Sequence, residues 1–342
     1  MIRVTQNGDT PTLDEVAKLA GVSKATASRA INGRSKVSAR AQTAVYNAVR
    51  ELGYTPNAAA RSLVTRRTGS VALIVPESDE RIFADPFFAR MLHLVARSMR
   101  EQQLQLVLMI AQPGDEEERL LVYLRGRYVD GAIVASHHRG DRLAEHLSDL
   151  GLPCVFIGRP WIGAERVSFV DSDNAAAASQ AVRVLLDAGR RRIATIAGPR
   201  DMRAGHDRLE GWRRELAADG LDHDLVAYGD FTEASGAKAC AELLDAAGDI
   251  DGIFAASDLM AQGAMRELAS RGLRVPEDVA IVGYDDLGVA EHTQPPLTTL
   301  HNPIGQMVTE AVRLLTEAID DSGRSAPRRV IFVPELVRRA SV

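Results

Sequence analysis

From residue 70 onward the chain alternates short apolar runs with longer amphipathic stretches, and this alternation constrains the fold more than any other feature. A short apolar run bounded by polar turns predicts a buried strand, and apolar residues at helical spacing predict the helices between them. Strands that alternate with helices form parallel sheets covered by helices. The runs that we interpret as strands are VALIV, LQLVLMI, GAIVA, PCVFI, VSFV, RIATIA, DGIFAA and VAIVGY.

Residues 70–342 exceed the usual length of one domain, so they predict an α/β core of two doubly wound parallel-sheet lobes. We expect the first lobe to comprise about 70–161 and 291–322, and the second about 162–290 and 323–342. Sheets of this kind bind ligands beyond the carboxyl ends of their strands. Polar residues just past the strands are therefore the candidates for a binding site.

Residues 11–55 predict an all-α helix-turn-helix headpiece instead. Thr12, Ser23 and Ser38 are placed to cap three successive helices, and Glu15 completes a capping-box pattern with Thr12. Two helices joined by a glycine-containing turn and braced by a third form a helix-turn-helix.

A short fourth helix is expected within residues 56–69, where the sequence offers no apolar face of its own. Isolated helices shorter than about 12 residues are marginal in water. This hinge helix should therefore form only against a partner, such as DNA or its counterpart in a second copy.

The formal net charge of −5 conceals an uneven distribution of charge along the chain. Residues 1–68 contain eleven Lys and Arg against four Asp and Glu, a net of +7, which leaves 30 basic and 42 acidic residues, a net of −12, in the remainder. A basic module attached to an acidic body is typical of a protein that binds nucleic acid at one end only.

Several function classes are excluded by the sequence. No apolar run approaches the length of about 18 residues that a membrane span needs, and the polar amino terminus favours a cytoplasmic location. Cys154 and Cys240 lack the spacing of a disulfide framework or a zinc site, so no metal and no cofactor are expected. The dinucleotide, phosphate-loop, acyl-transfer and zinc-protease motifs are missing from the sequence, so we expect no catalytic residues.

Long motifs resemble one family. TLDEVAKLAGVSKATASRAINGRSKVSARAQTAVYNAVRELGYTPNAAARSL is similar to the DNA-binding region of LacI/GalR repressors, and the likeness continues through AGPRDMRAGHDRLEGW, FAASDLMAQGAMREL, RVPEDVAIVGYDD and PPLTTLHNPIGQM. The resemblance implies a periplasmic-binding-protein-like core and a homodimeric, sugar-responsive repressor of carbohydrate-utilisation genes. Two identical headpieces imply a pseudo-palindromic operator in double-stranded DNA.

The second helix is expected to enter the major groove of DNA. Lys24 and Ala25 lead it, where a lysine suits guanine O6 and N7 and an alanine suits a thymine methyl group. By resemblance, further base or backbone contacts are expected from Thr26, Ser28, Arg29 and Asn32, and phosphate contacts from Thr12, Ser23 and Ser38.

The resemblance assigns the hinge to the minor groove. Leu63 and its symmetry mate are expected to wedge into a central C-G step and kink the duplex, with Asn57, Ala60 and Arg61 facing the same groove.

The resemblance also places a small sugar between the lobes. Arg208 matches an arginine that forks onto hydroxyls, Asp173 and Asp285 lie just past strands, and Phe231 is placed to stack on a sugar ring. Ser257 replaces an asparagine that is frequent in the family, which puts that contact in doubt. The other candidates are Asp85, Phe87, Phe88, Ser136, Arg159, Asp258 and Asn302.

The identity of the effector is left open by the sequence. The segment RIFADPFF resembles a loop of regulators that respond to plant-derived disaccharides such as cellobiose, and a monosaccharide is the alternative. The sign of the response and the choice between dimer and tetramer are open as well. The alternative function is a sugar-binding protein or sugar-acting enzyme with the same core, which would have no use for residues 12–64.

Overall fold

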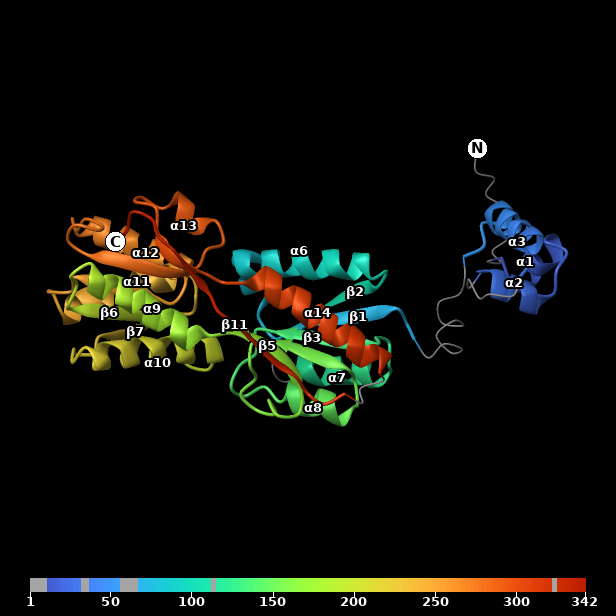
Figure 1. The fold of residues 1–342 in the computed structure, drawn as a ribbon, viewed down its shortest axis with the longest axis horizontal. Coiled ribbons are helices and arrows are strands. Elements are labelled where there is room, and N and C mark those ends of the chain that lie inside the picture. Colours follow the sequence, from blue (N-terminus) through green and yellow to red (C-terminus); the bar gives the residue numbers. More distant parts are fainter. Residues whose placement is uncertain (1–10, 32–36, 56–66, 112–114, 322–324) are drawn as a thin grey trace. The chain divides into compact units, whose positions relative to one another are not determined.

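A computed structural model describes residues 11–31, 37–55, 67–111, 115–321 and 325–342 of the chain. The chain divides into two compact units, Met1–Thr68 and Gly69–Val342 (Figure 1). The first is all-α, and the second contains two α/β lobes, so the predicted fold class is confirmed.

The headpiece consists of α1 (Leu13–Leu19), α2 (Lys24–Ile31) and α3 (Ala39–Leu52) around a small apolar core. The capping box at the start of α1 is present, because the Glu15 N–H donates to Thr12 Oγ1 at 3.3 Å and the Thr12 N–H donates to the Glu15 carboxylate at 2.7 Å. Ser38 caps α3 by accepting from the Ala41 N–H at 3.3 Å. The core side chains are Val16, Ala17, Ala27, Ala30, Val45 and Ala48.

The first lobe contains a six-stranded parallel sheet in the order β11-β5-β4-β3-β1-β2. Its strands are β1 (Ser70–Val75), β2 (Gln105–Ile110), β3 (Gly131–Ala135), β4 (Cys154–Ile157), β5 (Ser168–Ser172) and β11 (Arg329–Phe332). Its helices are α5 (Asp79–Ala84), α6 (Pro86–Glu101), α7 (Asp115–Arg125), α8 (Leu143–Asp149) and α14 (Ile304–Asp320). Figure 1 shows α6 and α14 running along one side of this sheet.

The second lobe repeats this plan with the order β12-β10-β9-β8-β6-β7, and only β12 runs antiparallel to its neighbour. Its strands are β6 (Ile193–Ala197), β7 (Val226–Tyr228), β8 (Gly252–Ala255), β9 (Ala280–Asp285), β10 (Thr298–His301) and β12 (Glu335–Val337). Its helices are α9 (Asn174–Asp187), α10 (Arg203–Ala218), α11 (Glu233–Ala246), α12 (Asp258–Ser270) and α13 (Val289–His292).

Helices cover both faces of each sheet, which explains the nearly continuous apolar strands. The five residues of β3 and the five of β6 are all buried, as is usual for parallel strands with helices on either side. Two apolar clusters flank each sheet. The strand ends that face the space between the lobes are therefore rigidly held.

The chain crosses between the lobes at positions that differ from the expected ones near 162, 291 and 323. Strand β5 belongs to the first sheet and β10 to the second, while β11 returns to the first sheet before β12 joins the second. The crossings therefore lie at about 173, 302–303 and 333–334. The expectation was wrong because strands of both lobes have the same apolar pattern, and only their hydrogen-bonded partners distinguish them.

Candidate functional site

A cavity lies between the two lobes of the Gly69–Val342 unit, and its walls surround about 770 Å³ of space, open solvent included. The walls come from loops and helix starts beyond the carboxyl ends of strands in both sheets. Doubly wound sheets bind ligands at this position.

Most of the residues that we expect to bind the effector line this cavity, and both lobes contribute them. The structure brings together Asp85, Phe87, Phe88, Ser136, Arg159, Arg208, Phe231, Asp285 and Asn302. Their role in binding stays a prediction.

Asp173 and Ser257 do not line the cavity. Asp173 caps α9 by accepting from the Ala176 N–H at 3.0 Å, and Ser257 caps α12 by accepting from the Met260 N–H at 3.2 Å. Asp and Ser directly before a helix are preferred N-caps. Both side chains therefore point toward the helices that they cap. The expectation that Asp173 and Ser257 contact the effector does not fit these positions.

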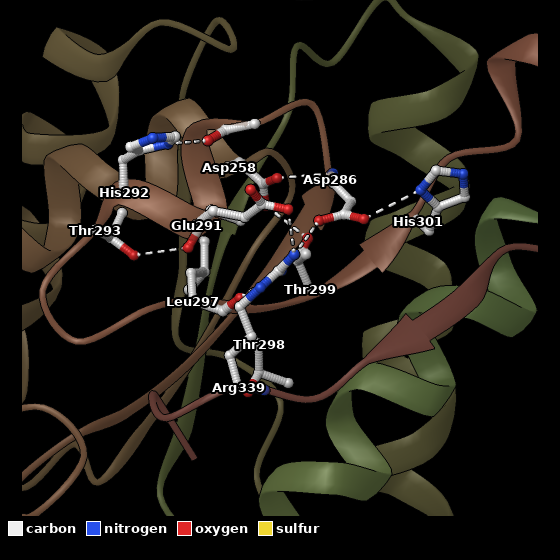
Figure 2. A network of polar contacts seen from close by, with 12 residues as sticks. Asp258, Asp286, Glu291, His292, Thr293, Leu297, Thr298, Thr299, His301 and Arg339 are labelled. Carbon is white, nitrogen blue, oxygen red and sulfur yellow. Dashed lines mark hydrogen bonds and ion pairs between the residues drawn. The ribbon is translucent and has the colours of Figure 1, made fainter.

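Asp258 does not line the cavity either, and its side chain is only 2% exposed. Its carboxylate accepts hydrogen bonds from Thr299 Oγ1 at 2.6 Å and from the Asp286 N–H at 2.7 Å (Figure 2). Burial raises the pKa of Asp258 well above its usual value, and the neighbouring Asp285 charge adds to this effect. This carboxylate makes its hydrogen bonds within the second lobe. The expectation that Asp258 contacts the ligand directly is therefore corrected: in the structure its side chain supports the backbone at Asp286 instead.

Arg208 is held on several sides by residues of the second lobe. Its Nε donates to the Asn174 side chain at 2.9 Å, and its Nη1 donates to the Ala256 carbonyl at 2.6 Å. Nη2 lies 3.8 Å from Asp285 Oδ1, and the guanidinium stacks on the Tyr284 ring at 3.4 Å from its centroid. These contacts fix the planar fork before any ligand arrives, which favours binding of adjacent hydroxyls.

Two carboxylates of the site titrate close to neutral pH. Burial raises the pKa of Asp285 to about 7, against the opposing charge of Arg208 and a hydrogen bond donated by Asn302 at 3.3 Å. Burial likewise raises the pKa of Asp171 to about 6. Either carboxylate can accept hydrogen bonds from hydroxyls when ionised and can donate one when protonated.

Three residues of the cavity have a left-handed backbone although none is glycine. The φ angles are 59° at Ser136, 70° at Phe231 and 119° at Asp285. Such conformations cost energy and persist where the surrounding structure imposes them, often at binding sites.

Aromatic rings give the cavity apolar surfaces beside its polar groups. Phe87 and Phe88 pack edge to face with centroids 5.5 Å apart, and the Phe231 ring lies 5.6 Å from the Arg81 guanidinium and 5.8 Å from that of Arg208. Sugars offer both hydroxyls and apolar ring faces, so this combination of groups suits them.

Sequence reasoning missed several residues of the cavity wall. Asp171, Ser172 and Asn174 flank the predicted Asp173, and the polar Asp171 within an apolar strand was the available signal. The remaining polar and sulfur-containing side chains that were missed are Arg81, His137, Met202, Arg203 and Met307.

Beside the cavity, His138 connects the lobes. Its Nε2 lies 3.1 Å from Glu77 in the first lobe and its Nδ1 lies 2.8 Å from Asp201 in the second. The hydrogen bond to Glu77 is the main cause that raises the pKa of His138 to about 9. At neutral pH the imidazolium therefore bridges two carboxylates, and we call Glu77, His138 and Asp201 the histidine bridge.

Trp161 adds a second connection between the lobes. Its Nε1 donates to the Asp201 carbonyl at 2.7 Å, and its ring lies 4.3 Å from the Arg139 guanidinium and 3.8 Å from that of Arg203. Arg139 belongs to the first lobe and Arg203 to the second. The indole is thus held by cation–π contacts from both lobes.

In the headpiece, α2 presents its first residues to solvent, while Ala27 and Ala30 face the core as predicted. Lys24 Nζ lies 2.7 Å from Asp14 on α1, and both side chains are more than half exposed. The expected DNA contacts Thr12, Ser23, Lys24, Ala25, Arg29 and Ser38 are exposed, and Thr26 and Ser28 are half-buried. Asn32, Asn57, Ala60, Arg61 and Leu63 lie outside the described residues.

The described part of the chain contains no helix that is both long enough and apolar enough to cross a membrane. Across the same residues, no group of His, Cys, Asp or Glu side chains is arranged to hold a metal ion.

Two family models match the chain. Residues 12–57 match the model for bacterial regulatory proteins of the lacI family, and residues 182–342 match a periplasmic binding protein-like domain.

Curated relatives match over nearly the whole chain. The transcriptional regulator CelR of Thermobifida fusca is 49% identical over 97% of this chain and 98% of its own. The regulator AscG of Escherichia coli K12 is 33% identical over 97% of this chain and 98% of its own.

Solved structures give the same picture. A complex of the transcriptional regulator CelR with cellobiose matches with a TM-score of 0.77 and 47% identity, over 97% of this chain and 100% of that one. A lac repressor dimer bound to operator and an anti-inducer has the same fold, with a TM-score of 0.86 at 24% identity over 97% of this chain and 99% of that one.

Proposed function

The chain belongs to the LacI family of bacterial regulatory proteins, and from this premise we propose that its affinity for operator DNA changes when cellobiose, or a closely related glucose disaccharide, binds between its lobes. It is a DNA-binding transcriptional regulator, as its relatives are. Cellobiose is named in the complex of the CelR relative, which supports the choice of this sugar.

The observation that carries the proposal is the chemistry of the cavity. The fixed Arg208 fork, the Asp285 carboxylate and the Asn302 amide offer donors and acceptors for hydroxyls. Phe87, Phe88 and Phe231 offer apolar surfaces for ring faces. A hydroxyl-rich ligand with apolar ring faces satisfies both.

Among the described residues, three of the four arginines that line the cavity already lie beside carboxylates, which favours an uncharged sugar over a sugar phosphate, and the fourth, Arg203, stacks on the Trp161 ring. Arg81 pairs with Glu77 at 2.8 Å, Arg159 pairs with Asp207, and Arg208 lies beside Asp285. An anionic ligand would have to displace these carboxylates. A neutral disaccharide instead only exchanges hydrogen bonds with them.

On the DNA side, we infer that two copies of the chain place their α2 helices in successive major grooves of a pseudo-palindromic operator in the cytoplasm. The exposed Lys24 and Ala25 at the start of α2 support base contacts there. The caps Thr12, Ser23 and Ser38 have backbone amides and hydroxyls near the helix starts, which suits phosphate contacts.

Titration calorimetry with cellobiose, with and without an operator fragment from the upstream region of the chain's own gene, tests the proposal. Coupling between two sites is reciprocal, so operator must change the affinity for cellobiose by the factor by which cellobiose changes the affinity for operator. Maltose, with the other linkage between its glucose units, serves as the control sugar. Equal cellobiose affinities with and without a bound operator would contradict the coupling.

A further inference from the structure

The turn after β9 carries Asp285 into the cavity on a strained backbone. Asp285 has φ 119° and Asp286 has φ 55°. Both residues therefore have a backbone conformation that residues other than glycine rarely adopt. A strained turn keeps its shape only where surrounding contacts hold it. Figure 2 shows those contacts converging on Asp286, the residue next to the cavity carboxylate.

The backbone of the turn is held by Asp258. The Asp286 N–H donates to Asp258 Oδ2 at 2.7 Å, while Thr299 Oγ1 donates to Asp258 Oδ1 at 2.6 Å. The fit around this carboxylate is close, because a Cβ added at Gly283 would lie 2.3 Å from Asp258 Oδ1. Strand β9 therefore needs a glycine at this position to admit the carboxylate.

The side chain of the turn is held by Arg339, near the end of the chain. Its Nη2 lies 2.7 Å from Asp286 Oδ1, with each of the two side chains 15% exposed. Its Nη1 donates to the Leu297 carbonyl at 3.0 Å, and its backbone N–H donates to Thr298 Oγ1 at 2.9 Å. The guanidinium thus connects the turn to the loop before β10.

We propose that Arg339 is a positioning residue for the effector site: through its ion pair with Asp286 it holds the strained turn that presents the Asp285 carboxylate to the ligand. This inference rests on the proposed function, because it concerns the same cavity. Arg339 does not line the cavity. It acts on the ligand only through the turn.

Loss of this ion pair should let the turn relax. Asp285 would then lose its alignment with Arg208, at 3.8 Å, and with Asn302, at 3.3 Å. A partly buried hydrogen bond between charged groups is worth enough to change an affinity about tenfold when it is removed. We therefore expect the variant Arg339→Gln to bind cellobiose about tenfold more weakly than the wild type.

The test compares full-length variants by calorimetry with cellobiose and by hydrogen exchange of the peptide that spans residues 283–288. Arg339→Gln should weaken binding and speed exchange, whereas Arg339→Lys, which retains a cation for Asp286, should recover part of both. Arg338→Gln is the matched control, because Arg338 is exposed and makes no polar contact with the described residues. Thermal unfolding checks that each variant is folded.

A double-mutant cycle shows whether Arg339 acts through Asp286. Asp286→Asn alone should weaken cellobiose binding, and adding Arg339→Gln should weaken it no further, because both changes remove the same ion pair. Additive losses would overturn the proposed route, as would wild-type affinity in Arg339→Gln. If the wild type itself does not bind cellobiose, the proposed effector is wrong. The role of Arg339 is then tested by hydrogen exchange in the ligand-free protein alone. Equal exchange rates in Arg339→Gln and Arg338→Gln would overturn the inference.

Discussion

Asp285 keeps its carboxylate in the cavity at a cost to stability that depends on pH. Burial raises its pKa to about 7, whereas an unfolded chain has an Asp pKa of about 3.9. Between these values the folded state binds more protons than the unfolded state, so this residue's contribution to stability falls as pH rises from about 4 to about 7.

The variant Asp285→Asn should therefore gain in melting temperature relative to the wild type as pH increases. Below about pH 4 the carboxyl is neutral in both the folded and the unfolded wild type and resembles the amide, so the two proteins should melt at similar temperatures, and by pH 5 the unfolded wild type has ionised and the difference has begun to grow. At pH 8 only the wild type carries the buried charge, and the variant should melt a few degrees higher. Thermal unfolding in matched buffers measures the difference, and a difference that is constant from pH 5 to 8 would contradict the assignment.

At the scale of single residues, sequence position identified the neighbourhood of the site but not which side chains face the cavity. Asp173 and Asp285 both follow strands, yet Asp173 caps α9 and Asp285 lines the cavity. A carboxylate just past a strand has both options, because the next helix needs a cap and the strand end adjoins the ligand site. The backbone path of the turn selects between them.

At the scale of elements, α1 and α2 share an exposed ion pair. Lys24 contacts Asp14 at 2.7 Å in the headpiece, and an exposed pair of this kind contributes about 0–1 kcal/mol. In the proposed complex with DNA, Lys24 can therefore exchange Asp14 for a base or a phosphate at little cost. Asp14 also brings a negative charge to α1, the helix that precedes α2.

We expect Asp14→Asn to tighten operator binding severalfold, because it releases Lys24 and removes one repulsive charge. Lys24→Ala should instead weaken binding and alter the base preference at one position in each half-site. Gel shifts on an operator series with single base changes measure both effects. A uniform loss across the series for Lys24→Ala would show that this lysine meets only phosphate.

The helix-capping residues and the apolar spacing in the sequence were sufficient to predict the helices of the headpiece. Thr12 and Ser38 cap α1 and α3 as predicted, and α2 buries the predicted Ala27 and Ala30. The short strands β7 and β10 were not predicted, because β7 has only three residues and β10 begins with two threonines in place of an apolar run.

At the scale of the whole core, the histidine bridge makes the connection between the lobes sensitive to pH. The pKa of His138 is raised to about 9, chiefly by its hydrogen bond to Glu77, whereas a histidine freed from the bridge has a pKa of about 6.5. Stabilisation from the imidazolium is therefore fully present below about 6.5 and is lost as pH rises through about 9. Other charges near it are Arg81, which pairs with Glu77, and Asp141, which accepts from the His138 N–H.

If a bound sugar needs closed lobes, the affinity for cellobiose should fall between about pH 6.5 and pH 9. His138→Gln should reduce this fall and bind cellobiose about three- to tenfold more weakly at pH 7, since it removes one charged hydrogen-bonding group. Calorimetry at several pH values measures both. His223→Gln is the control, because His223 is exposed and lies after α10, away from the cavity wall. An unchanged pH profile in His138→Gln would contradict the role of the bridge.

The sequence by itself determined the headpiece, the α/β class of the core, the family and nine of the twenty described residues that line the cavity, because periodicity, caps and long motifs are local properties of the chain. Only the tertiary structure decided which strands share a sheet, where the chain crosses between the lobes, and that His138 meets Glu77 and Asp201. Those partners lie 61 and 63 positions from His138 in the chain. The local conformational preferences of the chain do not encode contacts between residues so far apart in sequence. These contacts depend on how two separately packed sheets place their strand ends in space.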